Sequence, residues 1–469
     1  MRADLLSDGV DGLDEALAAV DGFDDVLVGG LLRPQPAQAG GLTGLADAVA
    51  GSPLAARVAE AAEKTAAGAG GEDHFVALAA ARTALLGSVH DALMGRVGEV
   101  TGRPDAETAG AVPGGDAPGG GEEPAGNLLL AARSWLCDLA RAGWQGIDHE
   151  LVAGAAPVVS AMLPDPALRR PATLLDGFAA ELAASCPGAT LERVPVRRWA
   201  DLWSRALLLT LPGAARAGAV AKVSGRLLPL GVDVQEHATA VQAQVHAVLE
   251  PSDGGAARLV RASVSAPKPD TVVGAGLWQL LRPRMSLLAA VSEGRAMELD
   301  AMSVTAEGDL VWDDARARAG ELAEVFATAR VALPTAVAFP VAPLDRHPAR
   351  MAVPVLVEGY AVEEDEDGMA LVVAGHRVAV DAGRVPAAGP LTPKVVAASG
   401  ACVGLLRWDA GEFLLQPLAV ERTVRKKTVA VHAGAWAGGT TDKAGVRAEK
   451  AATDAVTVLR ERAGKLLRK

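Results

Sequence analysis

The sequence predicts an α+β multidomain protein with a helical N-terminal half, an antiparallel β-rich C-terminal half and a terminal amphipathic helix. Apolar residues recur at helical spacing up to about Leu211 and alternate with polar residues after Pro212. A run of Gly and Pro interrupts the helical half. The length of 469 residues also exceeds what one hydrophobic core usually serves, so several domains are expected.

The first expected domain, residues 1–103, is an Ala-rich helical region. Ala- and Leu-rich segments separated by Gly and Pro predict helices near 11–28, 42–66 and 73–99. Residues 104–126 read as a Gly/Pro-rich flexible linker, because they hold too little apolar surface to offset the entropy of ordering. This linker marks the first domain boundary.

A second helical domain is expected at 127–211. Its sequence places Trp199 and Trp203 four residues apart, and therefore on one face of a helix. Two large apolar side chains on one face predict that they hold helices together in a core. The alternative is an exposed aromatic anchor for a partner, which would need both rings to be accessible.

An α+β domain with β-hairpins is expected at 212–335. Alternating apolar and polar residues predict a hairpin in which a strand over 239–249 turns at 251–255 into a strand from Arg258. A second strand pair is expected at 295–304 and 309–312. After it, Asp313 or Asp314 can cap a helix whose apolar stripe would comprise Leu322, Val325, Phe326 and Ala329.

Two further segments complete the predicted organisation. Alternating segments and turn residues over 336–420 predict a small antiparallel β domain of five or six strands, in which the acidic run Glu363–Gly368 forms a charged hairpin tip. Residues 421–469 are expected to form a basic connector and a C-terminal helix that begins at Thr441 or Asp442.

Charge is distributed unevenly along the chain. Residues 421–469 hold twelve Lys or Arg against five Asp or Glu, whereas the first 420 residues hold 33 against 52. Within the basic end, Arg425, Lys426 and Lys427 form a candidate contact for an acidic partner, in a strand or extended connector. A solvated tail, or docking of the tail onto the acidic body, remains open. A pI near 5.3 and an aromatic content of 3% argue against nucleic acid as a partner.

Local motifs that would indicate a defined chemistry are missing from the sequence. The Gly-rich run at 114–121 lacks the Gly-Lys-Ser/Thr of a phosphate-binding loop, and Gly274-Ala-Gly276 lacks the third glycine of a dinucleotide site. Ser292 lacks the first glycine of a nucleophile elbow. Histidines and cysteines show no metal-ligand spacing. We therefore predict no catalytic, cofactor-binding or metal-binding residues.

The competing hypothesis is a hydrolase or transferase whose site is assembled from dispersed residues. Asp233, Asp300 and Asp313, together with His237 or His246, could supply such a site. Catalytic groups meet in space and not along the sequence, so this hypothesis stays open at this stage.

The sequence also predicts a cellular location. The acidic start does not resemble a signal peptide, and no stretch of about 18 apolar residues predicts insertion into a membrane. Three cysteines, odd in number and far apart, are typical of reduced core residues. We expect a cytoplasmic protein.

Four segments of the β-rich half resemble an uncharacterised actinobacterial family: Gly231–Gln242, Pro343–Pro348, Pro354–Tyr360 and Leu405–Gly411. Genes of this family are found beside those of a MoxR-type AAA+ ATPase, a von Willebrand A-domain protein and a SWIM zinc-finger protein. The similarity extends over roughly 127–469 and implies an accessory or adaptor subunit that works with the ATPase or the A-domain protein. We therefore expect a non-catalytic adaptor that mediates protein–protein interaction.

Overall fold

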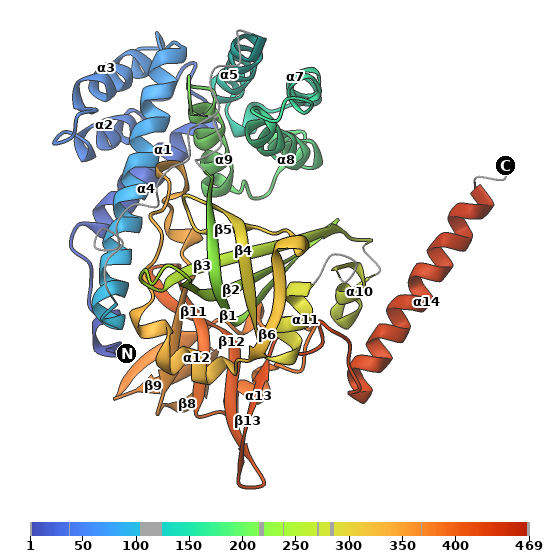
Figure 1. Ribbon diagram of the computed structural model, residues 1–469. Coiled ribbons are helices and arrows are strands. Elements are labelled where there is room, and N and C mark those ends of the chain that lie inside the picture. Colours follow the sequence, from blue (N-terminus) through green and yellow to red (C-terminus); the bar gives the residue numbers. More distant parts are fainter. Residues whose placement is uncertain are drawn as a thin grey trace.

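Helices occupy the N-terminal half of the chain and strands dominate the C-terminal half, which confirms the predicted fold class (Figure 1). In Figure 1 the helices of the N-terminal half form an upper layer, two β-sheets lie below them, and the last helix projects to one side. The predicted linker lies outside the described residues from 104 to 123. The computed structural model describes residues 2–36, 38–103, 124–214, 220–237, 239–269, 272–281, 286–366 and 368–466.

The helical layer is built around the long helix α4 (Glu72–Thr101). The single helix predicted near 42–66 is two helices, because Ser52 and Pro53 lie at a break and proline cannot continue a helical hydrogen-bond ladder. The other helices of the layer are α1 (Leu13–Gly29), α2 (Ala39–Ala48), α3 (Ala55–Ala66), α5 (Pro124–Ala142), α6 (His149–Ala153), α7 (Ala155–Met162), α8 (Arg169–Ser185) and α9 (Val196–Leu209).

One hydrophobic core serves these helices, and its buried residues come from α1–α4 and from α5–α9 alike. Trp199 and Trp203 of α9 are both buried, and the Trp199 ring meets Trp144 edge-on with ring centroids 5.9 Å apart. Nε1 of Trp203 donates a hydrogen bond to the carbonyl of Leu136 at 2.9 Å. The two tryptophans therefore hold helices together, as predicted.

Helix α4 joins the helical layer to the sheets. Phe75, in its first half, is buried among the helices, while Val89, Leu93 and Val97, in its second half, belong to the core that fills the sheets. One 30-residue helix thus contributes to both cores. Because its two halves are buried against different partners, α4 fixes where the sheets lie relative to the helices.

The first sheet closes on itself into a barrel. Its strands follow the order β1-β2-β3-β5-β4, and β4 pairs back with β1. β1 is bent by irregularities beside Gly225 and Gly231, so its start pairs with β4 and its end with β2. The strands are β1 (Val220–Glu236), β2 (Ala240–Pro251), β3 (Arg258–Pro267), β4 (Arg295–Thr305), β5 (Asp309–Val311) and β6 (Ala317–Leu322), the last of which extends the edge of β4.

The second sheet follows the order β7-β11-β12-β10-β9-β8, and β13 lies beside β12. β7 and β8 are separated only by Gly359, whose φ is +69°, and Tyr360. They act as two halves of one bent strand that reaches both ends of the sheet. The strands are β7 (Val353–Glu358), β8 (Ala361–Asp365), β9 (Gly368–Val373), β10 (His376–Val380), β11 (Ala401–Asp409), β12 (Glu412–Val424) and β13 (Lys427–His432).

The two sheets repeat one topology. Each has a single parallel pair, β3 with β5 in the first and β10 with β12 in the second, and all other pairs are antiparallel. Helices α10 (Leu277–Leu281) and α11 (Ser286–Glu293) separate β3 from β4, just as α13 (Pro393–Ala397) separates β10 from β11. With β7 and β8 counted as one strand, both sheets have the strand order of the Greek-key barrel called the OB-fold.

The prediction that a helix starts at Asp313 or Asp314 is wrong. Oδ1 of Asp313 accepts the N–H of Ala315, but this cap opens only a turn of 3-10 helix, after which the chain enters β6. Pairing with β4 satisfies the backbone of β6, and Leu322 is 74% exposed. Helix α12 begins only at Val325 (Val325–Val331). A tertiary strand partner has therefore overridden the local helical pattern.

The last helix, α14 (Lys443–Leu466), begins where the sequence predicts. Oδ1 of Asp442 accepts the backbone N–H groups of Ala444 and Gly445, as an N-cap does. The helix then points away from the sheets (Figure 1). Ala452 is buried against the turn that contains Gly276, whereas Val446 and Val458 are 46% and 45% exposed.

Candidate functional site

The three predicted contact residues lie at the tip of a β-hairpin that projects from the second barrel (Figure 1). This hairpin, here called the arm, comprises Glu421–His432, the end of β12 and all of β13. Arg425 and Lys426 form its two-residue turn, and Lys427 begins β13 opposite Val424. What the sequence suggested as a strand or extended connector is therefore folded back on itself.

Both turn residues have positive φ angles, +50° for Arg425 and +66° for Lys426. Positive φ at both central residues defines a type I′ turn, which matches the twist of a hairpin and favours Asn-Gly. Other side chains crowd the backbone in this conformation, at a cost of about 1 kcal/mol per residue relative to glycine. The stability of the turn by itself therefore favours residues other than these two cations.

The arm exposes both charge and apolar surface. Arg422 faces Val429 across the hairpin and Val424 faces Lys427, so these four side chains lie on one face. Val424 and Val429 are 38% and 40% exposed. Within the described chain, Arg422, Lys427 and the two turn cations form no ion pair and no side-chain hydrogen bond. Their positive charge is therefore available to a partner.

The base of the arm is held by an ion-pair group. The guanidinium of Arg330, on α12, donates to Glu358 of β7 at 2.9 and 3.0 Å and to Glu421 of the arm at 3.2 Å. Hydrogen bonds to these two carboxylates raise the pKa of Arg330 above its ordinary value. Helix α12 and strand β7 are thus both tied to the arm where it leaves the sheet.

Two of the dispersed candidates for a catalytic site do come together. Oδ2 of Asp233, on β1, accepts from Nη2 of Arg407 at 3.0 Å, and Oδ1 accepts from Nε2 of Gln416 at 2.7 Å. Arg407 also donates to Oε1 of Gln416 at 2.6 Å. His246, which is 1% exposed, interacts electrostatically with Asp233 and Arg407, and burial lowers its pKa to about 3.

This network joins the two barrels and does not open to a substrate. Asp233 and His246 belong to the first barrel, and Arg407 and Gln416 to the second. None of the four lines any cavity described below. Asp233 also accepts a hydrogen bond from Nε2 of Gln235, and Arg407 donates to the carbonyl of Met351, whereas Nε2 of His246 is buried without a partner. The arrangement is that of a buried structural contact between domains.

The remaining candidates lie apart from it and from each other. Asp300 is an exposed residue of β4, and Asp313 caps a 3-10 turn. His237 lies in the turn after β1, where its Nδ1 is 3.2 Å from Oγ1 of Thr239. The structure therefore does not assemble the acid and imidazole groups that the enzyme hypothesis required into one site.

One segment singled out by the family resemblance, Pro343–Pro348, has a structural role. Asp345 accepts hydrogen bonds from Arg170 of α8 at 2.8 Å and from Arg350 at 2.6 Å. His347 lies 3.5 Å from Asp201 of α9, and burial lowers the pKa of its imidazole to about 4. The segment thus joins the helical layer to the start of the second barrel.

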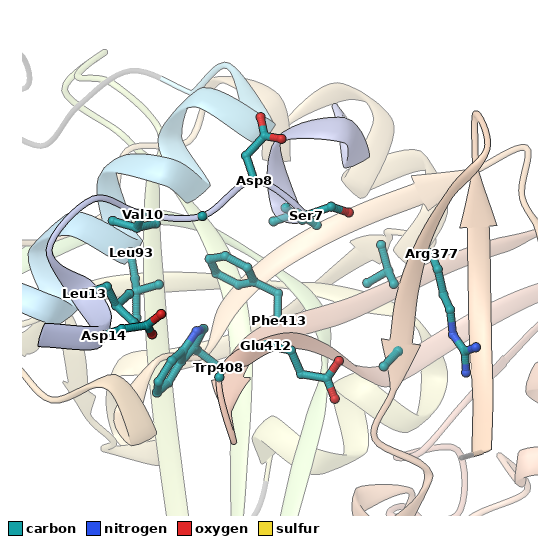
Figure 2. A pocket seen from close by; sticks show the side chains of 15 residues that line it. Ser7, Asp8, Val10, Leu13, Asp14, Leu93, Arg377, Trp408, Glu412 and Phe413 are labelled. Carbon is teal, nitrogen blue, oxygen red and sulfur yellow. The ribbon is translucent and has the colours of Figure 1, made fainter. Parts of the chain in front are cut away.

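A cavity of about 330 Å³ lies beside the N-terminal loop (Figure 2). Its walls are the loop before α1, residue Leu93 of α4, strand β10 and the turn between β11 and β12. Trp408 and Phe413 contribute aromatic rings, and Asp14 and Glu412 contribute carboxylates. Sequence reasoning missed this site, because its residues are separated by up to about 400 positions and share no motif.

Comparisons with known proteins add no assignment. No family model, no curated protein and no solved structure matches this chain. Across the described ranges, no group of three or more His, Cys, Asp or Glu side chains is arranged to hold a metal ion. Among the helices that the structure describes, none is long and apolar enough to cross a membrane.

Proposed function

We propose that this chain is a non-catalytic adaptor whose arm binds an acidic surface on a protein partner. The observation that carries the proposal is the placement of Arg425 and Lys426 in a type I′ turn, where positive φ disfavours both residues. Conformational strain of this kind is concentrated at functional positions, because other requirements keep the residue in place.

The shape and chemistry of the arm support a protein partner. The exposed valines at 424 and 429 add apolar contact area beside the cations, which a purely solvated tip would not need. Among the strands that the structure describes, β13 pairs only with β12, so its other edge can pair with a strand of another chain. The resemblance to a family encoded beside a MoxR-type AAA+ ATPase makes that ATPase, or its A-domain protein, the partner we propose to test first.

The test uses a variant that removes the charge while improving the turn. Arg425→Asn with Lys426→Gly supplies the residues that a type I′ turn prefers, so the hairpin is expected to remain folded. Tagged full-length chain, wild type or variant, is used to recover partners from a lysate of the native host. We expect the variant to lose an acidic protein that the wild type recovers, and purified components to bind more weakly as salt increases.

The control removes two positive charges elsewhere. Arg57→Gln with Lys64→Gln acts on exposed positions of α3, in the helical layer. This control should recover the same proteins as the wild type. If the variant with the redesigned turn recovered the same proteins as the wild type, the proposed role of the arm would be contradicted. If the α3 control lost the same partner, the loss would be due to net charge and not to the arm.

A further inference from the structure

We propose that the cavity between the N-terminal loop and the second barrel binds an organic cation, a guanidinium or ammonium group. Such a group can belong to a peptide side chain or to a small molecule. The site is separate from the arm, and its volume of about 330 Å³ is at the lower end of the range for small-ligand pockets. It therefore suits one basic side chain or a compound of similar size.

Aromatic surface is the first reason. Only 3% of the residues of this chain are aromatic, yet Trp408 and Phe413 both line the cavity (Figure 2). Trp408 is only partly buried, and within the described chain its indole N–H donates no hydrogen bond. The faces of such rings attract cations, and tryptophan does so most strongly.

Charge is the second reason. Asp14 and Glu412 line the cavity, and in the part of the chain that the structure describes neither carboxylate forms an ion pair or accepts a hydrogen bond. The wall contains one arginine, Arg377, which is bound by both carboxylate oxygens of Asp365. Its charge is thereby compensated, and the lining is left negative. A phosphate or carboxylate ligand would be repelled, while a cation would be attracted.

The walls are fixed before any ligand binds. Arg96 of α4 holds the N-terminal loop, donating from Nη1 to the carbonyls of Leu5 at 2.6 Å and Asp8 at 3.0 Å, and from Nη2 to that of Gly9 at 3.3 Å. The opposite wall is the turn between β11 and β12, which belongs to a paired hairpin. Fixed walls reduce the entropy lost on binding.

An adjoining cavity indicates where the rest of a longer ligand would lie. It measures about 710 Å³, shares Arg377, Ala379 and Glu412 with the first, and adds Asp381 and Asp409. Glu412 lies between the two spaces. A peptide could therefore place one basic side chain beside Trp408 and continue past further carboxylates, whereas a small cation would occupy the first cavity alone.

The experiment compares charged and neutral probes on the full chain. A fluorescein-labelled Gly-Ser-Arg-Ser-Gly peptide is titrated by anisotropy against the same peptide with citrulline, which keeps the shape of arginine and removes its charge. Agmatine, a small guanidinium compound, is titrated by calorimetry, with maltotriose as a neutral polar probe. We expect arginine-dependent binding, with binding of the peptide alone indicating a peptide source and binding of agmatine as well indicating a small cation.

Variants tie that binding to the cavity. Asp14→Asn and Glu412→Gln keep side-chain size and should each weaken binding about tenfold, the loss expected for one charge-assisted hydrogen bond. Glu363→Gln with Glu364→Gln, on exposed positions of β8, should leave binding unchanged, as should Arg425→Asn with Lys426→Gly. Equal binding of the arginine and citrulline peptides, preference for maltotriose, or no binding of any probe at millimolar concentration would overturn the proposal.

Discussion

In the part of the chain that the structure describes, buried charges are paired with opposite charges, and this explains why its buried acids lie beside other polar groups. Arg82 and Asp24, both about 1% exposed, are joined by two hydrogen bonds of 2.6 and 2.9 Å. Between the barrels, Asp233 accepts one hydrogen bond from Arg407 at 3.0 Å. A buried charge without a partner loses several kcal/mol of solvation, so pairing is the rule wherever the fold encloses one. The position of Asp233 near His246 is therefore explained by the packing of the two barrels and does not indicate a catalytic site.

The state of His246 makes a prediction about acid stability. In the folded chain the pKa of His246 is lowered to about 3, mainly by burial and also by the positive charges of Arg261 and Arg407, while the charge of Asp233 opposes this shift. The unfolded chain takes up the proton first as pH falls, because its histidine has a pKa near 6.5. The free energy of unfolding therefore decreases as the pH falls from about 6.5 to about 3. Between pH 7 and pH 5 the decrease is about 2 kcal/mol.

The measurement is urea unfolding at pH 7 and at pH 5. His246→Gln cannot take up this proton, so the variant should lose about 2 kcal/mol less than the wild type between the two pH values. His149→Gln, at an exposed position on α6, should show the wild-type loss. An equal loss in wild type and His246→Gln would show that this imidazole does not titrate on unfolding.

At the scale of elements, the turn of the arm carries two cations in a conformation that is less stable for them than for Asn and Gly. Replacing Arg425 and Lys426 by Asn and Gly should stabilise the hairpin by about 1–2 kcal/mol, because both positive-φ residues are relieved. Amide hydrogen exchange at Val424 and Lys427, which pair beside the turn and bond to each other through their backbone groups, should slow accordingly. Faster exchange in the variant would mean that the turn is not strained in the wild type.

Helix α14 is attached to the body at a small contact. A Cβ atom built on Gly276 would lie 2.2 Å from Cβ of Ala452, and Nε2 of Gln279 donates to the carbonyl of Glu449 at 2.9 Å. Gly276→Leu should therefore release α14 and speed its cleavage by trypsin. Gly464→Leu, on α14 where nothing lies within 4 Å of a Cβ, should not. Equal cleavage rates would show that this contact does not hold the helix.

For the whole molecule, we expect the contact between the barrels to be sensitive to a single substitution. Asp233→Asn leaves the guanidinium of Arg407 without its anionic partner in a buried interface. We expect a loss of about 3 kcal/mol in the free energy of unfolding, as is typical when one member of a buried pair is removed. Glu293→Gln, which breaks an exposed pair with Arg295, should cost less than about 0.5 kcal/mol.

A double variant separates the pair from its surroundings. Asp233→Asn combined with Arg407→Gln removes both charges, so its loss should be smaller than the sum of the two single losses by at least about 1 kcal/mol. Chemical denaturation of the four chains provides the measurement. Additive losses would show that the two side chains contribute independently and that their ion pair does not stabilise the interface.

The sequence alone located several individual elements, but it did not predict the strand β1 or the short helices α10, α11 and α13. Periodicity located the long helix near 73–99, the hairpin of β2 and β3 and the hairpin of β4 and β5, because these depend on contacts close along the chain. It failed after Asp313, where the backbone of β6 finds its partner in β4. It placed Arg425–Lys427 in the basic end but not in a turn, since that depends on how β12 and β13 pair.

Composition and periodicity determined the fold class, the helical and β-rich halves and the basic character of the end, because burial patterns and net charge follow directly from residue type. Tertiary structure decided the order of the strands, the repeated barrel topology and the cavity beside Trp408. These arise from pairs such as β3 with β5 and β10 with β12, and from Asp14 lying near Glu412. Contacts between residues so far apart are selected by the packing of the whole chain, which no local pattern records.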